Sequence, residues 1–330
     1  MNDYLWDKSG SPDEDVQRLE TLLGTLRSRR PAPALPAPSR APLRTWPLFA
    51  AAAVVLLALW VTWTPRPTAT SSWGVEWLDG TSWADARVVR AGRVRAGQSI
   101  ETRHDRARVA VGEIGEVELE PATRVTLVDA GRRDHRLSLA HGTIHATIWA
   151  PPGQFLVETP SALAVDLGCR YSLEVTAAGN GVLRVEAGWV GFEHDGRLSL
   201  IPAGAVGDTR VGHGPGTPHY EDASVAFGRA LDVLDFGGTG AEREAAVATV
   251  LSEARARDAL SLWHLLTRTA GTERVRVFER LATLVPPPAG VTRDGVLRGD
   301  QSMLEAWWGE LGLESAEFWR MWTRKWSKAE

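Results

Sequence analysis

The sequence predicts an α+β chain with three parts in order: a single transmembrane helix, an all-β region built as a sandwich or stacked β-roll, and a small all-α bundle. Residues 45–64 form an uncharged apolar run, residues 73–206 alternate with period two, and residues 222–288 have helical periodicity. The chain of 330 residues carries a formal net charge of −4, so it lacks the basic excess expected of a protein that binds nucleic acid directly.

Residues 1–30 predict a short amphipathic segment. Its helix starts with Ser11 as N-cap, Pro12 at the first helical position and Glu14 at the third. Because about thirty residues cannot build a core of their own, the apolar stripe of this helix predicts a surface that binds a partner. The alternatives are a frayed helix or one resting on the lipid interface. This leucine stripe consists of Val16, Leu19, Leu22, Leu23 and Leu26.

Residues 31–44 predict a linker, because the run PAPALPAP cannot continue a helix. Residues 45–64 then read TWPLFAAAAVVLLALWVTWT, without a charged side chain. A helix of this length spans about 30 Å, roughly the hydrocarbon thickness of a bilayer. Trp46, Trp60 and Trp63 lie near its ends, which is typical of aromatic belts. A buried core helix and a signal peptide are the alternatives, but a signal peptide begins nearer the N-terminus. We expect an uncleaved transmembrane helix.

The charges on either side of this run predict its orientation. Five arginines and no acidic residue lie in residues 27–44, whereas Arg66 alone follows the run before acidic residues appear. The basic flank stays in the cytoplasm. The N-terminus is therefore expected inside, with residues 65–330 on the other side of the bilayer.

Residues 73–206 predict many half-buried strands. Val109 and Val111 are two residues apart, Val117 and Leu119 alternate with glutamates, and glycine, proline or aspartate separates the runs. Strands at intervals of roughly 8 to 12 residues are typical of sandwiches, barrels and rolls. Residues 207–221 contain the glycine-rich run 212–216, which lacks the lysine of a P-loop and predicts a linker.

Residues 222–288 predict a small helical bundle or two stacked helical hairpins that serve packing or interaction. Residues 289–330 predict a tryptophan-rich helical tail, in which Trp319, Trp322 and Trp326 lie on one helical face. This face either docks on the bundle or contacts a partner or the membrane.

We find no catalytic motif in the sequence. It has neither a G-x-S-x-G elbow nor an H-E-x-x-H helix, and Cys169 is its only cysteine. His135, His141 and His145 have the same strand parity, and a metal site there would need a further ligand such as Asp134. Histidines on a solvated sheet face are the commoner arrangement. We therefore predict no enzyme, no metal and no cofactor.

Six motifs occur in order in the β-rich region. They are GQSIET at 97–102, RARV at 106–109, ELEPAT at 118–123, LAHG at 139–142, FLVETP at 155–160 and DLGCRY at 166–171. Together they resemble a FecR-type domain.

This resemblance implies a protein like the ferric-citrate regulator. In that family a cytoplasmic piece controls an extracytoplasmic-function sigma factor, one helix crosses the bacterial inner membrane, and a periplasmic β domain senses a signal. The resemblance thus implies a sigma factor as cytoplasmic partner, and a periplasmic protein, outer-membrane protein or envelope ligand outside. An envelope scaffold or a glycan- or protein-binding module anchored by one helix is the alternative.

Overall fold

The computed structural model describes residues 14–24, 72–79, 87–131 and 134–313. The chain divides into two compact units, at 1–66 and 67–330, and each is described by itself. In the first unit, α2 (Glu14–Gly24) is the described element. None of the helices in these described ranges is long and apolar enough to cross a membrane. The predicted transmembrane run at 45–64 lies outside the described residues.

The second unit begins with sixteen strands, counted over the described residues. They are β1 (Ser72–Asp79), β2 (Arg87–Arg95), β3 (Ser99–Glu101), β4 (Arg106–Val111), β5 (Gly115–Leu119), β6 (Arg124–Ala130), β7 (His135–Ile148), β8 (Phe155–Glu158), β9 (Leu163–Asp166), β10 (Arg170–Val175), β11 (Gly181–Ala187), β12 (Trp189–His194), β13 (Arg197–Pro202), β14 (Ala205–Arg210), β15 (Gly214–Pro215) and β16 (His219–Tyr220).

Two sheets share the long strand β7. Its first half pairs with β6 and β8, and its second half pairs with β5 and β10. One sheet therefore runs β2-β1-β4-β5-β7-β10-β11-β14, and the other runs β3-β6-β7-β8-β9-β12-β13. The pair β7–β8 is parallel, and the other described pairs are antiparallel.

The side chains of β7 change faces at Gly142, where the strand passes from one sheet to the other. Before this glycine, Leu137 and Leu139 are buried; after it, Ile144 and Ala146 are buried, so the parity shifts by one. Gly142 has a φ of 100°, and a Cβ atom there would come within 2.4 Å of the Cα of Thr123. Both the backbone conformation and the close approach thus require glycine.

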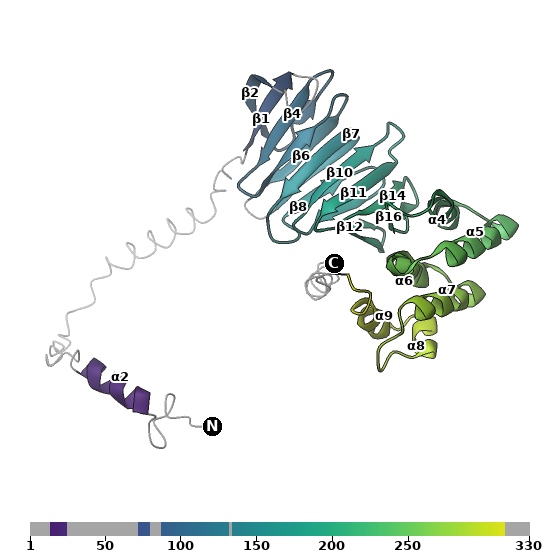
Figure 1. The fold of residues 1–330 in the computed structure, drawn as a ribbon. Coiled ribbons are helices and arrows are strands. Elements are labelled where there is room, and N and C mark those ends of the chain that lie inside the picture. Colours follow the sequence, from purple (N-terminus) through teal and green to yellow (C-terminus); the bar gives the residue numbers. More distant parts are fainter. Residues whose placement is uncertain (1–13, 25–71, 80–86, 132–133, 314–330) are drawn as a thin grey trace, which may run out of the picture. The chain divides into compact units, whose positions relative to one another are not determined.

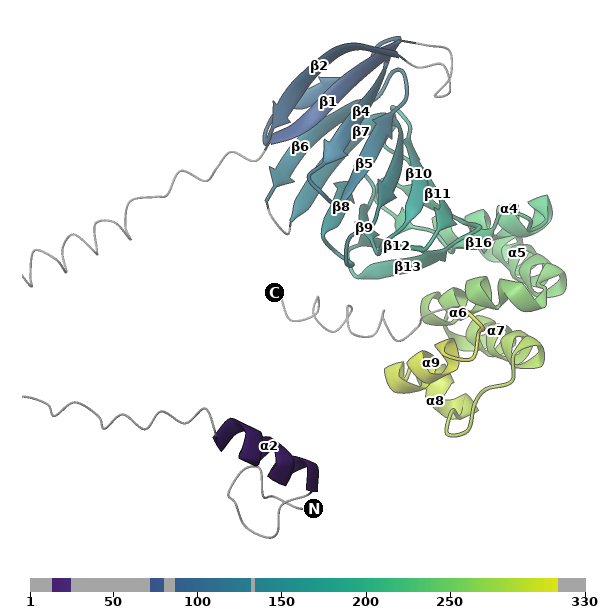
Figure 2. The ribbon, with the colours of Figure 1, turned by 60° about the vertical axis from the view of Figure 1, so that its left-hand side comes forward.

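Helices follow the strands. They are α4 (Val225–Phe236), α5 (Gly240–Glu253), the 3₁₀ turn η1 (Ala256–Asp258), α6 (Ala259–Arg268), α7 (Gly271–Leu284), α8 (Arg293–Arg298) and α9 (Gln301–Trp308). Figures 1 and 2 show them beside the end of the β region that holds β13 and β16, away from β1 and β2. Phe227, Leu231 and Leu234 of α4 are buried as the helical spacing predicts, and one apolar core continues from the sheets into the helices. The predicted α+β class is confirmed.

The segment 207–221, for which the sequence predicts a linker, is part of this structure. It contains the end of β14 together with β15 and β16, both of which pair with β14. Thr209 and Thr217 are buried within it. Glycine is required at position 216 because the backbone lies close to another group: a Cβ atom there would approach Phe236 to 2.8 Å.

Candidate functional site

The leucine stripe is exposed on α2. The side chains of Leu19, Leu22 and Leu23 are 57%, 62% and 59% exposed, and Val16 is half-buried. Spacings of three and four residues place them on one face of the helix. An apolar helical face of this kind in water is suited to burial against a partner. Leu26, the last member of the stripe, lies outside the described residues.

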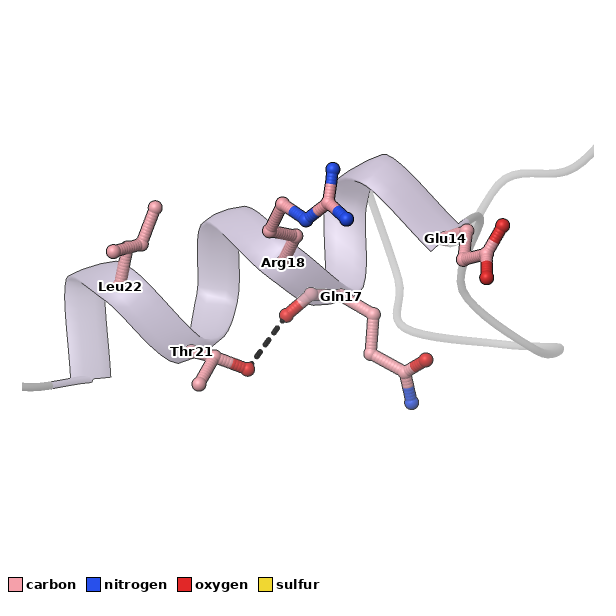
Figure 3. A pocket seen from close by; sticks show the side chains of 5 residues that line it. All are labelled: Glu14, Gln17, Arg18, Thr21 and Leu22. Carbon is pink, nitrogen blue, oxygen red and sulfur yellow. Dashed lines mark hydrogen bonds between the residues drawn. The ribbon is translucent and has the colours of Figure 1, made fainter.

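The opposite face of α2 is polar. Figure 3 shows Gln17 and Thr21 one turn apart, with the hydroxyl of Thr21 donating to the carbonyl oxygen of Gln17 at 2.8 Å. A shallow pocket is lined by Glu14, Gln17, Arg18 and Thr21 of this face, together with Leu22 at the border of the leucine stripe. Because all five residues belong to one helix, no opposing wall encloses a small molecule. The feature on α2 that fits a protein partner is therefore the leucine stripe.

The three histidines of β7 do not meet. His135 is buried, with its ring centroid 5.7 Å from that of Trp73. His145 lies on the opposite face, with Nε2 3.3 Å from Oε1 of Glu120, and His141 reaches the carbonyl oxygen of Ala122. Equal strand parity does not place all three on one face, because the alternation of buried and exposed side chains shifts by one at Gly142, between His141 and His145. In the described part of the chain, no cluster of three or more His, Cys, Asp and Glu side chains is placed to hold a metal.

A buried polar group lies in the turn between β9 and β10. The thiol of Cys169 donates to Oδ2 of Asp166 at 2.7 Å, and the amide of Gly168 donates to Oδ1 at 2.7 Å. Burial raises the pKa of Asp166 to about 7, although these hydrogen bonds oppose the shift. Burial and the neighbouring Asp166 raise the pKa of the Cys169 thiol well above its usual range. Cys169 is therefore a protonated, unreactive thiol that supports the turn.

A second buried group joins α6 to the β region. The guanidinium of Arg268 donates to the hydroxyl of Ser199 at 2.6 Å and to that of Thr217 at 2.8 Å. Asp235 of α4 accepts from the amide of Thr217 at 2.6 Å, and lies 3.5 Å from Arg268. Asp235 also accepts from Arg197 of β13. Burial lowers the pKa of Arg268 to about 10, so it stays charged at neutral pH beside its carboxylate.

Comparison with known proteins gives a family for the centre of the chain. Residues 98–191 match the family model described as FecR protein. This segment is a FecR-type domain. The FecR domain runs from just before β3 to the middle of β12, and it includes β7 and the Asp166 turn. No curated protein matches the chain.

Solved structures with some similarity include two crystal structures of "a putative anti-sigma factor" from Parabacteroides distasonis. Each is 15% identical to this chain, with a TM-score of 0.34. The match covers 38% of this chain and 61% of that chain, which is less than two thirds of its length.

The structure describes some of the sequence-predicted site residues and not others. Val16, Leu19, Leu22 and Leu23 lie together on α2. Trp319, Trp322 and Trp326 lie outside the described residues, so their partner surface stays a prediction. The polar groups around Asp166 and Arg268 were not predicted, because each joins residues that have no common sequence pattern.

Proposed function

We propose that this chain is a FecR-like transmembrane regulator of an extracytoplasmic-function sigma factor. The observation that carries this proposal is the match of residues 98–191 to the FecR protein family. Residues 45–64 would cross the bacterial inner membrane, with the N-terminus in the cytoplasm and residues 65–330 in the periplasm. The charge asymmetry around the apolar run supports this orientation.

In this proposal the leucine stripe of α2 binds the sigma factor. An amphipathic helix binds a protein by laying its apolar face into a groove, with anchors three and four residues apart. The exposed side chains of Leu19 and Leu23 are such anchors. Each apolar side chain that becomes fully buried contributes about 1.5–3 kcal/mol before the costs of association.

The periplasmic part acts as a non-enzymatic sensor in the same proposal. A periplasmic or outer-membrane protein, or another envelope ligand, binds the FecR domain or the helices that follow it. The continuous core and the buried Arg268–Asp235 pair join the sheets to helices α4–α9, which supports a sensor in which both parts move together when a ligand binds.

The test is a pull-down from the native bacterium with the full-length chain as bait. The variant Leu19→Asp/Leu23→Asp places two carboxylates in the stripe. The variant Gln17→Asp/Thr21→Asp places the same two carboxylates on the polar face of α2, and is the matched control. We expect the wild type and the control to capture a sigma factor, identified by mass spectrometry. The stripe variant should capture at least about tenfold less of this sigma factor. A wild-type bait that retains no sigma factor contradicts the proposal.

A further inference from the structure

The strand β2 is the outer strand of its sheet. It pairs with β1 from Ser72↔Arg95 to Asp79↔Arg87, and no other described strand pairs with its second edge. At the end of β2, the N–H of Arg95 donates to Oε1 of Gln98 at 2.9 Å and its carbonyl oxygen accepts from the N–H of Gln98 at 3.0 Å, so the open part of the edge lies ahead of Arg95. Backbone N–H and C=O groups along such an edge can pair with another extended chain. The side chains of Val88 and Val89 are 54% and 60% exposed, so the strand also presents apolar surface. Figure 2 shows β2 running along β1 at the end of the β region far from α4–α9.

This edge is strongly basic. The nine residues of β2 read RVVRAGRVR, with Arg87, Arg90, Arg93 and Arg95 and no acidic residue. In the described part of the chain, none of the four forms an ion pair with a carboxylate. Positive charge without paired carboxylates attracts an acidic partner and steers its approach.

Two of these arginines are held in place by neighbours on β1. The guanidinium of Arg90 lies 3.9 Å from the ring centroid of Trp77. That of Arg93 donates to the hydroxyl of Ser72 at 2.8 Å and to its carbonyl oxygen at 3.1 Å. Arginines fixed in this way lose less conformational entropy when they bind a carboxylate.

The charges also decide which chain can occupy the edge. A second copy of β2 would bring arginine opposite arginine, and like charges directly across two strands are destabilising. An extended segment with carboxylates at alternate positions would instead meet Arg93 and Arg95, which are two residues apart and so lie on one face of the strand.

We propose that the free edge of β2 is the docking site for an extended acidic segment of a partner protein, which adds a strand to the sheet. Its backbone pairs with the part of β2 ahead of Arg95, whose own N–H and C=O are bonded to Gln98, and its alternate Asp or Glu side chains contact the guanidinium groups of Arg93 and Arg95. This site is separate from α2, so the docking proposal can fail or succeed independently of the sigma-factor proposal.

The test uses the full-length chain and a fluorescent peptide, acetyl-(Val-Glu)₄-amide, in an anisotropy titration. The variant Arg93→Glu/Arg95→Glu reverses two charges on β2. The variant Arg293→Glu/Arg298→Glu makes the same change of net charge at two exposed arginines of α8, of which Arg293 lies 3.6 Å from Glu279, and is the control for net charge. We expect the β2 variant to raise the Kd of the peptide by about tenfold or more, because two cross-strand charge pairs are replaced by repulsion between the new glutamates and those of the peptide. We expect the control to stay within about twofold of wild type.

Two further probes use the wild-type chain, so they do not depend on the folding of a variant. A peptide of the same sequence with alternate N-methyl groups cannot complete the strand pairing, and we expect no binding. If the N-methyl peptide binds with the same affinity as the unmodified peptide, strand addition is overturned. If the β2 and α8 variants weaken peptide binding equally, the role of Arg93 and Arg95 is overturned. Binding to phosphatidylglycerol vesicles without binding to the peptide would instead assign the basic edge to phosphate groups and overturn the proposal.

Discussion

The imidazole of His264 on α6 accepts a hydrogen bond at Nε2 from the backbone N–H of Leu200 on β13, over 3.0 Å. Its Nδ1 donates to the carbonyl oxygen of Leu260, at 2.8 Å. The neutral ring therefore uses both nitrogens, one within its own helix and one on the sheet. His264 and Leu200 are both buried, so this hydrogen bond links the helices to the β region in the interior of the unit.

Replacing His264 with alanine is expected to destabilise the chain by about 2–4 kcal/mol. The variant leaves the buried amide of Leu200 without an acceptor and opens a cavity beside it. Urea unfolding followed by circular dichroism measures the loss. His104 is exposed, and His104→Ala should stay within about 0.5 kcal/mol of wild type. Equal effects of the two substitutions would show that the contact is not important for stability.

His264 should also make stability depend on acid. Burial, together with nearby Arg268, lowers its pKa to about 3 in the folded chain, against 6.5 as the ordinary value. The unfolded chain therefore takes up a proton first, and stability is lost as the pH falls from about 6.5 towards 3. The slope from one proton is at most about 1.4 kcal/mol per pH unit. As the pH is lowered from about 6.5 towards 3, we expect the free energy of unfolding of wild type to decrease relative to that of His264→Gln. A difference that does not change with pH would contradict the lowered pKa of His264.

Asp166 should act in the opposite direction. Its folded pKa of about 7 lies above the ordinary 3.8, so its contribution is present below about pH 4 and is lost as the pH rises through 7. Asp166→Asn does not titrate and keeps an acceptor for the amide of Gly168. We expect this variant to gain stability relative to wild type between pH 4 and 7, by up to about 1.4 kcal/mol per pH unit. Urea unfolding at several pH values measures the gain, and parallel pH profiles would contradict the raised pKa.

The ion pair between Asp235 and Arg268 should matter far more than an exposed one on the same helix. Asp235→Ala leaves a buried guanidinium without its carboxylate, which costs about 3–5 kcal/mol. Asp232 of α4 lies 3.5 Å from Arg210, with both side chains 45% exposed, and Asp232→Ala should cost less than about 1 kcal/mol.

A double variant separates charge burial from packing at this pair. Asp235→Leu/Arg268→Met removes both charges, and we expect it to be more stable than Asp235→Ala. If thermal or urea unfolding ranks the double variant as the less stable of the two, packing and the other hydrogen bonds of Arg268 dominate.

The orientation of the chain can be tested with reporter fusions. Alkaline phosphatase is active only in the periplasm. If the run at 45–64 spans the membrane with the N-terminus inside, the enzyme joined after residue 71 should be active and the enzyme joined at residue 40 should be inactive. Deleting residues 45–64 should move the chain out of the membrane fraction. Activity at residue 40 would reverse the orientation, and unchanged fractionation after the deletion would remove the span.

Local patterns predicted a large part of this fold. Alternation located β4 and β5, and the spacing of Phe227, Leu231 and Leu234 located α4, because burial on one face leaves its period in the sequence. The leucine stripe on α2 was found for the same reason. These signals need only a few neighbouring residues, so they are readable without knowledge of the tertiary structure.

Contacts between distant segments were not predictable in this way. Arg268 and Ser199 are 69 residues apart, and nothing near either residue indicates the other. The short strand β15 consists of Gly214 and Pro215, which are typical of loops, and it is a strand only because β14 lies beside it. The requirement for glycine at position 142 also involves a distant segment, because a Cβ atom there would collide with Thr123.

The position of β1 determines how the second unit would carry a mechanical load. β1 lies between β2 and β4, and both neighbours are antiparallel to it. The hydrogen bonds of antiparallel ladders run across the strands, so a force along β1 strains both ladders in shear and many bonds must break together. A tension applied to the chain ahead of Ser72 would therefore meet a stiff attachment. The second unit would then be displaced as a body before β1 is pulled away.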